Sequence, residues 1–294
     1  MDNYKLLGIS MIVLQSVIYG LPDSYVKLVY QEFPVMSFLG CRYALATLLM
    51  LVFWGKNIIE DVRQAEVKHY IIPVLCMGSA FLISNSALKY TTVGNAAFVR
   101  SSTPIVAAVM LMLFFQRRFT WRDAVILSIV LGGMYCLAVQ RGASFSQGFG
   151  FGELLSFTAA CAMAGSLVFG KDALKYIKPL SLSWLQCVAS LMFCCLVGLF
   201  DGSLQSTDWN LLEKNYVWGS LLYLTIPCSI GGLQLQNLAL KYINSKTISV
   251  LQCLYPIVAA VVAYFVLGEA MTGIGILGCV MVISSVLLEC LSRE

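Results

Sequence analysis

The chain has 294 residues and a formal net charge of +4, and 59% of its residues are hydrophobic while only 12% are charged. Its mean hydropathy is +0.83. Soluble domains carry about 25% charged residues, so this chain has too little polar surface for a soluble enzyme, a disordered tail or a nucleic-acid-binding domain. The composition predicts a polytopic membrane protein.

Apolar stretches follow one another from the first residues to the last. A bilayer core about 30 Å thick needs about 20 mainly apolar residues per helix. Ten stretches meet this requirement, at 6–28, 34–54, 70–88, 93–115, 123–140, 152–170, 180–200, 217–240, 247–267 and 272–290. The first lacks a signal-peptide cleavage pattern, so we interpret it as a transmembrane helix. The longest connectors, 55–69 and 201–216, are too short for a folded domain.

Basic residues orient the predicted bundle, because loops rich in Lys and Arg stay in the cytoplasm. If the N-terminus is inside, thirteen basic residues fall on its side of the membrane and four on the other, namely Lys27, Lys89, Arg141 and Lys214. We therefore expect both termini to be cytoplasmic. The absence of an N-x-S/T sequon favours a bacterial cytoplasmic membrane over a eukaryotic cell surface.

The chain repeats itself at an offset of 152 residues. Asn85–Tyr90 recurs with changes as Asn237–Tyr242, and Pro104–Val109 recurs unchanged as Pro256–Val261. The sequence thus predicts a five-helix unit written twice, over 1–145 and 146–294. Because five is odd, the second copy enters the membrane from the opposite side. Inverted repeats of this kind are typical of secondary transporters, which bind substrate where the two copies meet.

Pro104 and Pro256 occupy matched positions inside two predicted helices. A proline there removes a hydrogen bond to the carbonyl four residues earlier, so we expect helix breaks that serve gating. Each freed carbonyl, of Arg100 or Gln252, would lie beside that residue's polar side chain, at the depth of a binding site. The alternative is a packing kink whose carbonyl is capped by a neighbouring Ser or Thr.

Arg100 is the sharpest binding candidate, since an arginine deep in a bilayer costs about 2.5–3.5 kcal/mol and is a functional site by default. A guanidinium suits a carboxylate or phosphate. Arg42 in the second helix is a weaker candidate. Either side chain could instead extend to the outer surface. Glu153 could be a boundary residue or a proton carrier.

These features resemble the drug/metabolite transporter superfamily, and specifically its EamA-like proteins. The resemblance spans essentially the whole chain and rests on Gly20 with Lys27, Gly165 with Lys171, Pro34 with Arg42, Pro104, Pro256 and Leu267–Glu269. Two departures are Gln116–Arg118, where the family has Gly-Glu, and Gln186, where the second copy has Arg. The resemblance implies ten helices around a central cavity. Carried over by position, it favours as substrate-binding residues Gln15, Tyr19, Asn85, Arg100, Tyr223, Gln234, Gln252 and Tyr255, although the tyrosines can also simply pack and Asn85 can cap or gate.

The sequence and the resemblance together predict an all-α integral membrane protein that exports amino acids or related small polar metabolites by alternating access. Nutrient uptake and multidrug efflux by the same fold are the alternatives, and a membrane sensor or intramembrane enzyme is a remote one. We expect a small-molecule substrate and the lipid bilayer as partners, and no nucleic acid, cofactor, metal or catalytic residue. Proton coupling and the oligomeric state stay open.

Overall fold

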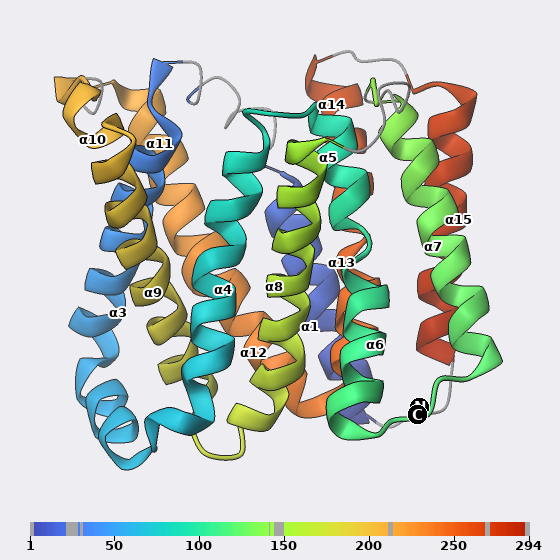
Figure 1. Ribbon diagram of the computed structural model, residues 1–294, viewed down its shortest axis with the longest axis horizontal. Coiled ribbons are helices and arrows are strands. Elements are labelled where there is room, and N and C mark those ends of the chain that lie inside the picture. The colour runs from blue at the N-terminus through green and yellow to red at the C-terminus, as the bar shows by residue number, and fades with distance from the viewer. Residues whose placement is uncertain are drawn as a thin grey trace.

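A computed structural model describes residues 3–21, 29, 32–140, 142–143, 150–210, 214–267 and 271–291. Over these residues the chain is helical, without a strand. Nine helical stretches are long and apolar enough to cross a membrane, and α1 (Asn3–Gly20) runs alongside them (Figure 1). The prediction of an all-α membrane protein with ten crossings is confirmed. Lys27, Arg141 and Glu269, which the sequence analysis names, lie outside the described residues.

The first five crossings are α1; α3 (Val35–Gln64); α4 (Val67–Ala87); the pair α5 (Val93–Arg100) and α6 (Thr103–Phe115); and α7 (Trp121–Gln140). The second five are α8 (Phe151–Ala173); α9 (Pro179–Phe200); α11 (Asn215–Tyr223) with the π-helix η2 (Leu224–Gly232) and α12 (Leu233–Tyr242); the pair α13 (Ser245–Gln252) and α14 (Tyr255–Leu267); and α15 (Gly273–Leu291). A short helix, α10 (Ser203–Ser206), lies in the connector after α9.

The inverted repeat is visible in the two broken crossings. Each bound of α13 and α14 lies 152 residues after the matching bound of α5 and α6. The α5–α6 crossing runs toward the end of the bundle where α1 begins and α15 ends, while α13–α14 runs away from it (Figure 1). We call this end the terminal face and the other end the opposite face.

The two copies interlock. The first helix of each copy packs on the third crossing of the other, so α1 contacts α12 and α8 contacts α4. The second helices, α3 and α9, pack together at one side of the bundle, and the fifth helices, α7 and α15, at the other (Figure 1). The largest apolar cluster draws its buried side chains from both copies, among them Ile12, Val130, Leu167, Leu251 and Val282.

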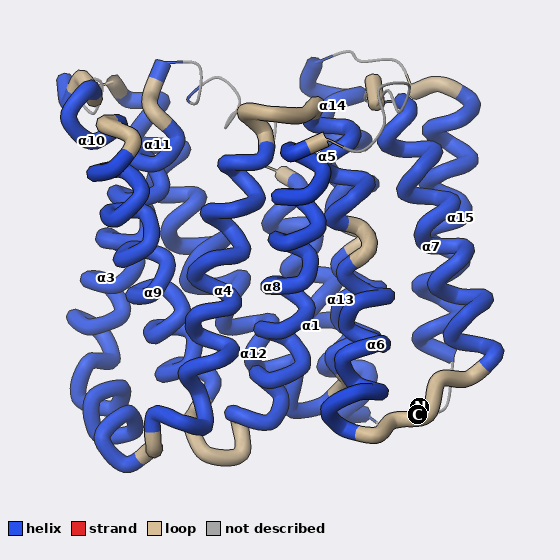
Figure 2. Tube along the Cα trace, in the orientation of Figure 1, coloured by secondary structure: helices blue, strands red, loops and turns tan. Residues whose placement is uncertain are grey.

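Two features of the helices differ from the sequence prediction. Helix α3 continues to Gln64, because residues 55–64 carry no proline and prolong the helix beyond the apolar stretch instead of forming a connector. The prolines also lie at helix starts: α5 ends at Arg100, and Pro104 lies in the first turn of α6. Figure 2 shows the interruption between α5 and α6 midway between the faces.

Candidate functional site

A cavity of about 350 Å³ lies among the two helix breaks and the helices around them. Its walls come from the last turns of α1, α4 and α5, the first turns of α3, the first half of α8 and the start of η2. The direction in which each helix runs shows where its lining residues lie. These residues place the cavity in the half of the bundle toward the opposite face (Figure 1). This volume suits a small metabolite, since ligand pockets typically measure about 300–1,000 Å³.

Of the ten residues predicted to bind substrate or to break helices for gating, the structure brings seven to this cavity. They are Tyr19, Asn85, Arg100, Gln252, Tyr255, Pro104 and Pro256. Both helix breaks therefore open onto the space that the repeat predicted between the copies.

Arg100 ends α5 and is held from both halves of the chain. Its Nη1 donates to Ser84 Oγ at 2.6 Å, and its Nη2 donates to Tyr255 Oη at 3.2 Å. Its own backbone carbonyl accepts a hydrogen bond from Thr103 Oγ1 at 2.7 Å. A side chain therefore caps this carbonyl, as the packing alternative expected, while the guanidinium still lines the cavity.

Arg42 provides a second guanidinium in the cavity wall. Its Nε donates to Ser229 Oγ at 2.7 Å, and its guanidinium carbon lies 5.3 Å from the centroid of the Tyr43 ring. Ser229 belongs to η2, where the wide helical turns contain Pro227. Such turns often occur at functional sites. The apolar pattern of the sequence does not distinguish η2 from an α-helix, and the available signal was a proline close to Gly231 and Gly232.

Gln252 joins the cavity to an amide cluster on its terminal side. Gln252 Nε2 donates to Gln15 Oε1 at 3.1 Å and to Gln236 Oε1 at 2.8 Å. Gln15 Nε2 also donates to the carbonyl of Gly232 at 3.0 Å. Gln15 and Gln236 are fully buried. Gln15 thus lies behind Gln252 and outside the cavity wall, joining α1 to the second copy.

Two further predicted residues also lie outside the wall. Tyr223 Oη donates to the carbonyl of Ile18 at 3.1 Å and so ties α11 to α1. Gln234 accepts from Ser183 Oγ at 3.2 Å, in a polar network between α9 and α12. In that network Asn237 Nδ2 donates to Ser183 Oγ at 2.8 Å and to Gln186 Oε1 at 2.9 Å. The spacing of polar residues along a helix does not distinguish a side chain that bonds another helix from one that lines the cavity.

The wall is mostly apolar, and its charges have one sign. Among the described residues that line it, the only charged side chains are the two arginines, and none is Asp or Glu. Glu153, the proton-carrier alternative, lies near the opposite face, where Asn95 Nδ2 and the backbone nitrogen of Gly150 donate to it at 3.1 and 3.0 Å. In a low dielectric, a guanidinium such as that of Arg100, in a wall whose described residues include no Asp or Glu, attracts an anionic group.

Relatives of this chain carry transporter names. It is 22% identical to an uncharacterized transporter of Bacillus subtilis, YyaM, over 92% of this chain and 90% of the relative. It is 21% identical to an uncharacterized transporter of Archaeoglobus fulgidus, over 97% of this chain and 85% of the relative. A solved crystal structure superposes with a TM-score of 0.77 at 15% identity, covering 97% of this chain and 95% of that one, and shows a common fold.

The model of one family matches both copies, over residues 6–139 and 150–289. These two segments contain all ten crossings and every residue of the cavity wall. The protein belongs to the EamA-like transporter family.

Proposed function

We propose that this protein exports a small metabolite with a carboxylate or phosphate group, such as an amino acid, by alternating access across a bacterial cytoplasmic membrane. The observation that carries the proposal is Arg100, which donates to the neutral oxygens of Ser84 and Tyr255 in a cavity wall whose described residues include no acid. A guanidinium binds a carboxylate or phosphate through paired hydrogen bonds. Ser84, Asn85, Gln252 and Tyr255 supply neutral hydrogen-bonding groups for the rest of the molecule.

The arrangement of the two halves supports alternating access. The cavity occupies the half toward the opposite face, while the terminal half contains the amide cluster of Gln15, Gln236 and Gln252. Because the copies are inverted, exchanging their conformations would move the open space to the terminal face. With both termini in the cytoplasm, the present arrangement is the outward-facing one.

Metabolite profiling tests the proposal without assuming a cargo. We expect medium from cells that express the protein to gain one anionic or zwitterionic metabolite relative to an empty-vector control. Cells that express Arg100→Gln should lose this gain at equal protein level. Depletion of a medium component would show uptake instead of export. Accumulation of a lipophilic cation would contradict the anion-binding cavity.

Gly232 offers a more local test, because it lies directly beneath the ring of Tyr19. A Cβ atom at Gly232 would lie 2.7 Å from Cε1 and Oη of Tyr19, so Gly232→Ala must displace this cavity-lining ring. We expect cargo binding to weaken roughly tenfold, as for the loss of one good hydrogen bond. The control is Gly219→Ala, which has no atom within 4 Å of the added carbon. Unchanged binding in Gly232→Ala would remove Tyr19 from the site.

A further inference from the structure

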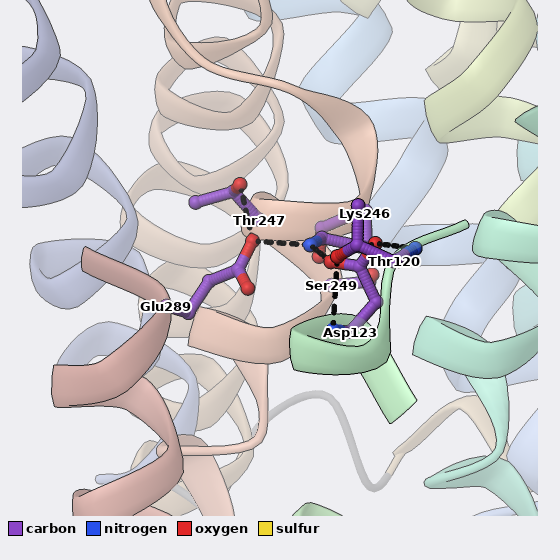
Figure 3. Close-up of polar contacts among 6 residues, drawn as sticks. All are labelled: Thr120, Asp123, Lys246, Thr247, Ser249 and Glu289. Atoms are coloured by element: carbon purple, nitrogen blue, oxygen red, sulfur yellow. Dashed lines mark hydrogen bonds and ion pairs between the residues drawn. The ribbon is translucent and has the colours of Figure 1, made fainter. Parts of the chain in front are cut away.

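A second cavity, of about 180 Å³, lies at the terminal face, away from the arginine pair. Its walls carry a buried charge cluster in which one lysine is shared by two carboxylates. Lys246 of α13 forms an ion pair with Asp123 of α7 and another, at 3.1 Å, with Glu289 of α15 (Figure 3). Thr247 Oγ1 also donates to Glu289 Oε1, at 2.7 Å. Glu289 is 3% exposed.

The two carboxylates are supported very differently. Asp123 lies in the first turn of α7, where its Oδ2 accepts from the backbone nitrogen and Oγ1 of Thr120, both at 2.9 Å (Figure 3). A helix N-terminus favours negative charge. Glu289 lies in the last turn of α15, where the helix dipole disfavours a negative charge. Its Oε1 accepts from Thr247 Oγ1 and pairs with Lys246 Nζ, while its Oε2 is buried without a partner among the described residues.

Glu153 shows what a fully supported buried glutamate looks like in the same chain. It is 6% exposed and also lies in a helix terminus, the first turn of α8. Its Oε1 accepts from Thr91 and Asn95, and its Oε2 accepts from the backbone of Gly150. An ionised carboxylate needs such donors on both oxygens when it is buried. Glu289 lacks them on one oxygen, and a proton on that oxygen removes the cost of a buried negative charge.

We propose that Glu289 Oε2 is a proton-binding site through which the proton concentration on the terminal side regulates transport, an inference that rests on the proposed function. A proton from the terminal-face solution adds to Oε2, and Glu289 changes from a carboxylate to a neutral carboxylic acid. Lys246 keeps its own proton and its ion pair with Asp123, but loses the ion pair with Glu289. The side chains of Arg117 and Arg118 line the same cavity and are exposed to solvent, so the cavity provides the route for the proton.

Lys246 links the proton-binding site to the central cavity through one helix. Lys246 lies in the first turn of α13, and the same short helix ends at Gln252, which lines the central cavity. Loss of the Lys246–Glu289 pair weakens the link between the terminal end of α13 and α15, and leaves the hydrogen bond from Thr247 to Glu289 Oε1. Among the described residues, the other charged groups around Glu289 are Lys246, Asp123, Arg117 and Arg118, with Lys5 of α1 near the adjacent residue Cys290. Both arginines are solvated, and solvent screens their charges.

Infrared difference spectroscopy tests the proton site directly and needs no cargo. The full chain is purified, reconstituted in phosphatidylcholine membranes and labelled with carboxyl-¹³C glutamate. Spectra are taken while the medium is cycled between neutral and mildly acidic pH. We expect a carboxylic-acid band of a buried glutamate that shifts with the ¹³C label. The band should vanish in Glu289→Gln and persist in Glu153→Gln.

If Glu289→Gln does not fold, Thr247→Val replaces it, because this variant removes the hydroxyl bonded to Oε1 and keeps the carboxyl group. The band should then shift in frequency and remain. Absence of any protonated buried glutamate in the wild type, or a band that survives unchanged in Glu289→Gln and Thr247→Val, would overturn the proposal. Because the measurement involves no substrate, it stands or falls separately from the metabolite profile.

Discussion

Replacing Arg100 by Gln is expected to weaken binding of the anionic cargo roughly 10- to 100-fold. A hydrogen bond between charged groups contributes about 1.5–3 kcal/mol, and every 1.4 kcal/mol changes an equilibrium tenfold. Arg100 meets its described partners, Ser84 and Tyr255, through neutral oxygens only. Its charge is therefore not cancelled by a carboxylate among them, and an anion in the cavity gains the full interaction.

The measurement is equilibrium binding of the metabolite that profiling identifies, on purified wild type and variant. The matched control is Arg63→Gln, which also removes one arginine, but from the exposed last turn of α3 and outside both cavities. Arg42→Gln should resemble Arg100→Gln, because both guanidinium groups line the same wall. Equal affinity of Arg100→Gln and wild type would show that this arginine only stabilises the helix break.

The second large effect is structural, and concerns the packing of α7 on α15. The two helices meet at glycines: a Cβ atom at Gly278 would lie 2.7 Å from the carbonyl oxygen of Gly133, and one at Gly133 would lie 2.9 Å from that of Gly278. Because backbone atoms are the obstacle, rotamer changes cannot relieve the clash. We expect Gly278→Ala to destabilise the fold by about 1–3 kcal/mol, the usual cost of overpacking, with Gly133→Ala similar.

Thermal unfolding in detergent, followed by the exposure of buried cysteines to a thiol dye, measures this effect. Gly273→Ala is the control, because it adds the same methyl group to the same helix with nothing within 4 Å. If Gly278→Ala unfolds at the same temperature as Gly273→Ala, the helices separate at little cost and their contact is not part of the stable core.

Much of the fold follows from local patterns in the chain. Each crossing requires a long apolar stretch, and the 152-residue repeat predicted matched breaks at Pro104 and Pro256 because a proline cannot continue a helix's hydrogen bonds. The structure moves these prolines from the middle of helices to the starts of α6 and α14. The sequence could not foresee this, because two consecutive turn residues before each proline end the preceding helix fully instead of kinking it.

The sequence was a weaker guide to which residues line the central cavity. Arg100 could be identified from the sequence, because a charged side chain in an apolar helix is costly to insert and marks a functional site by default. Gln15 and Gln234 satisfied the same criterion of a polar group in an apolar helix, yet both pair with amides or hydroxyls of neighbouring helices outside the cavity wall. Arg42, the weaker candidate from the sequence, lines the same wall as Arg100 and is held there by Ser229, a residue 187 positions away.

The sequence by itself determined that this chain lies in a membrane, how many times it crosses, and that its two copies face opposite ways, because apolar length, charge bias and repeats act locally along the chain. Only the tertiary structure decided which polar side chains face open space and which satisfy one another. It likewise decided that Glu289 keeps one oxygen without a donor while Glu153 does not. Hydrogen bonds between helices that are far apart in the sequence determine which side chains are paired. Such pairings produce no periodic pattern along the chain.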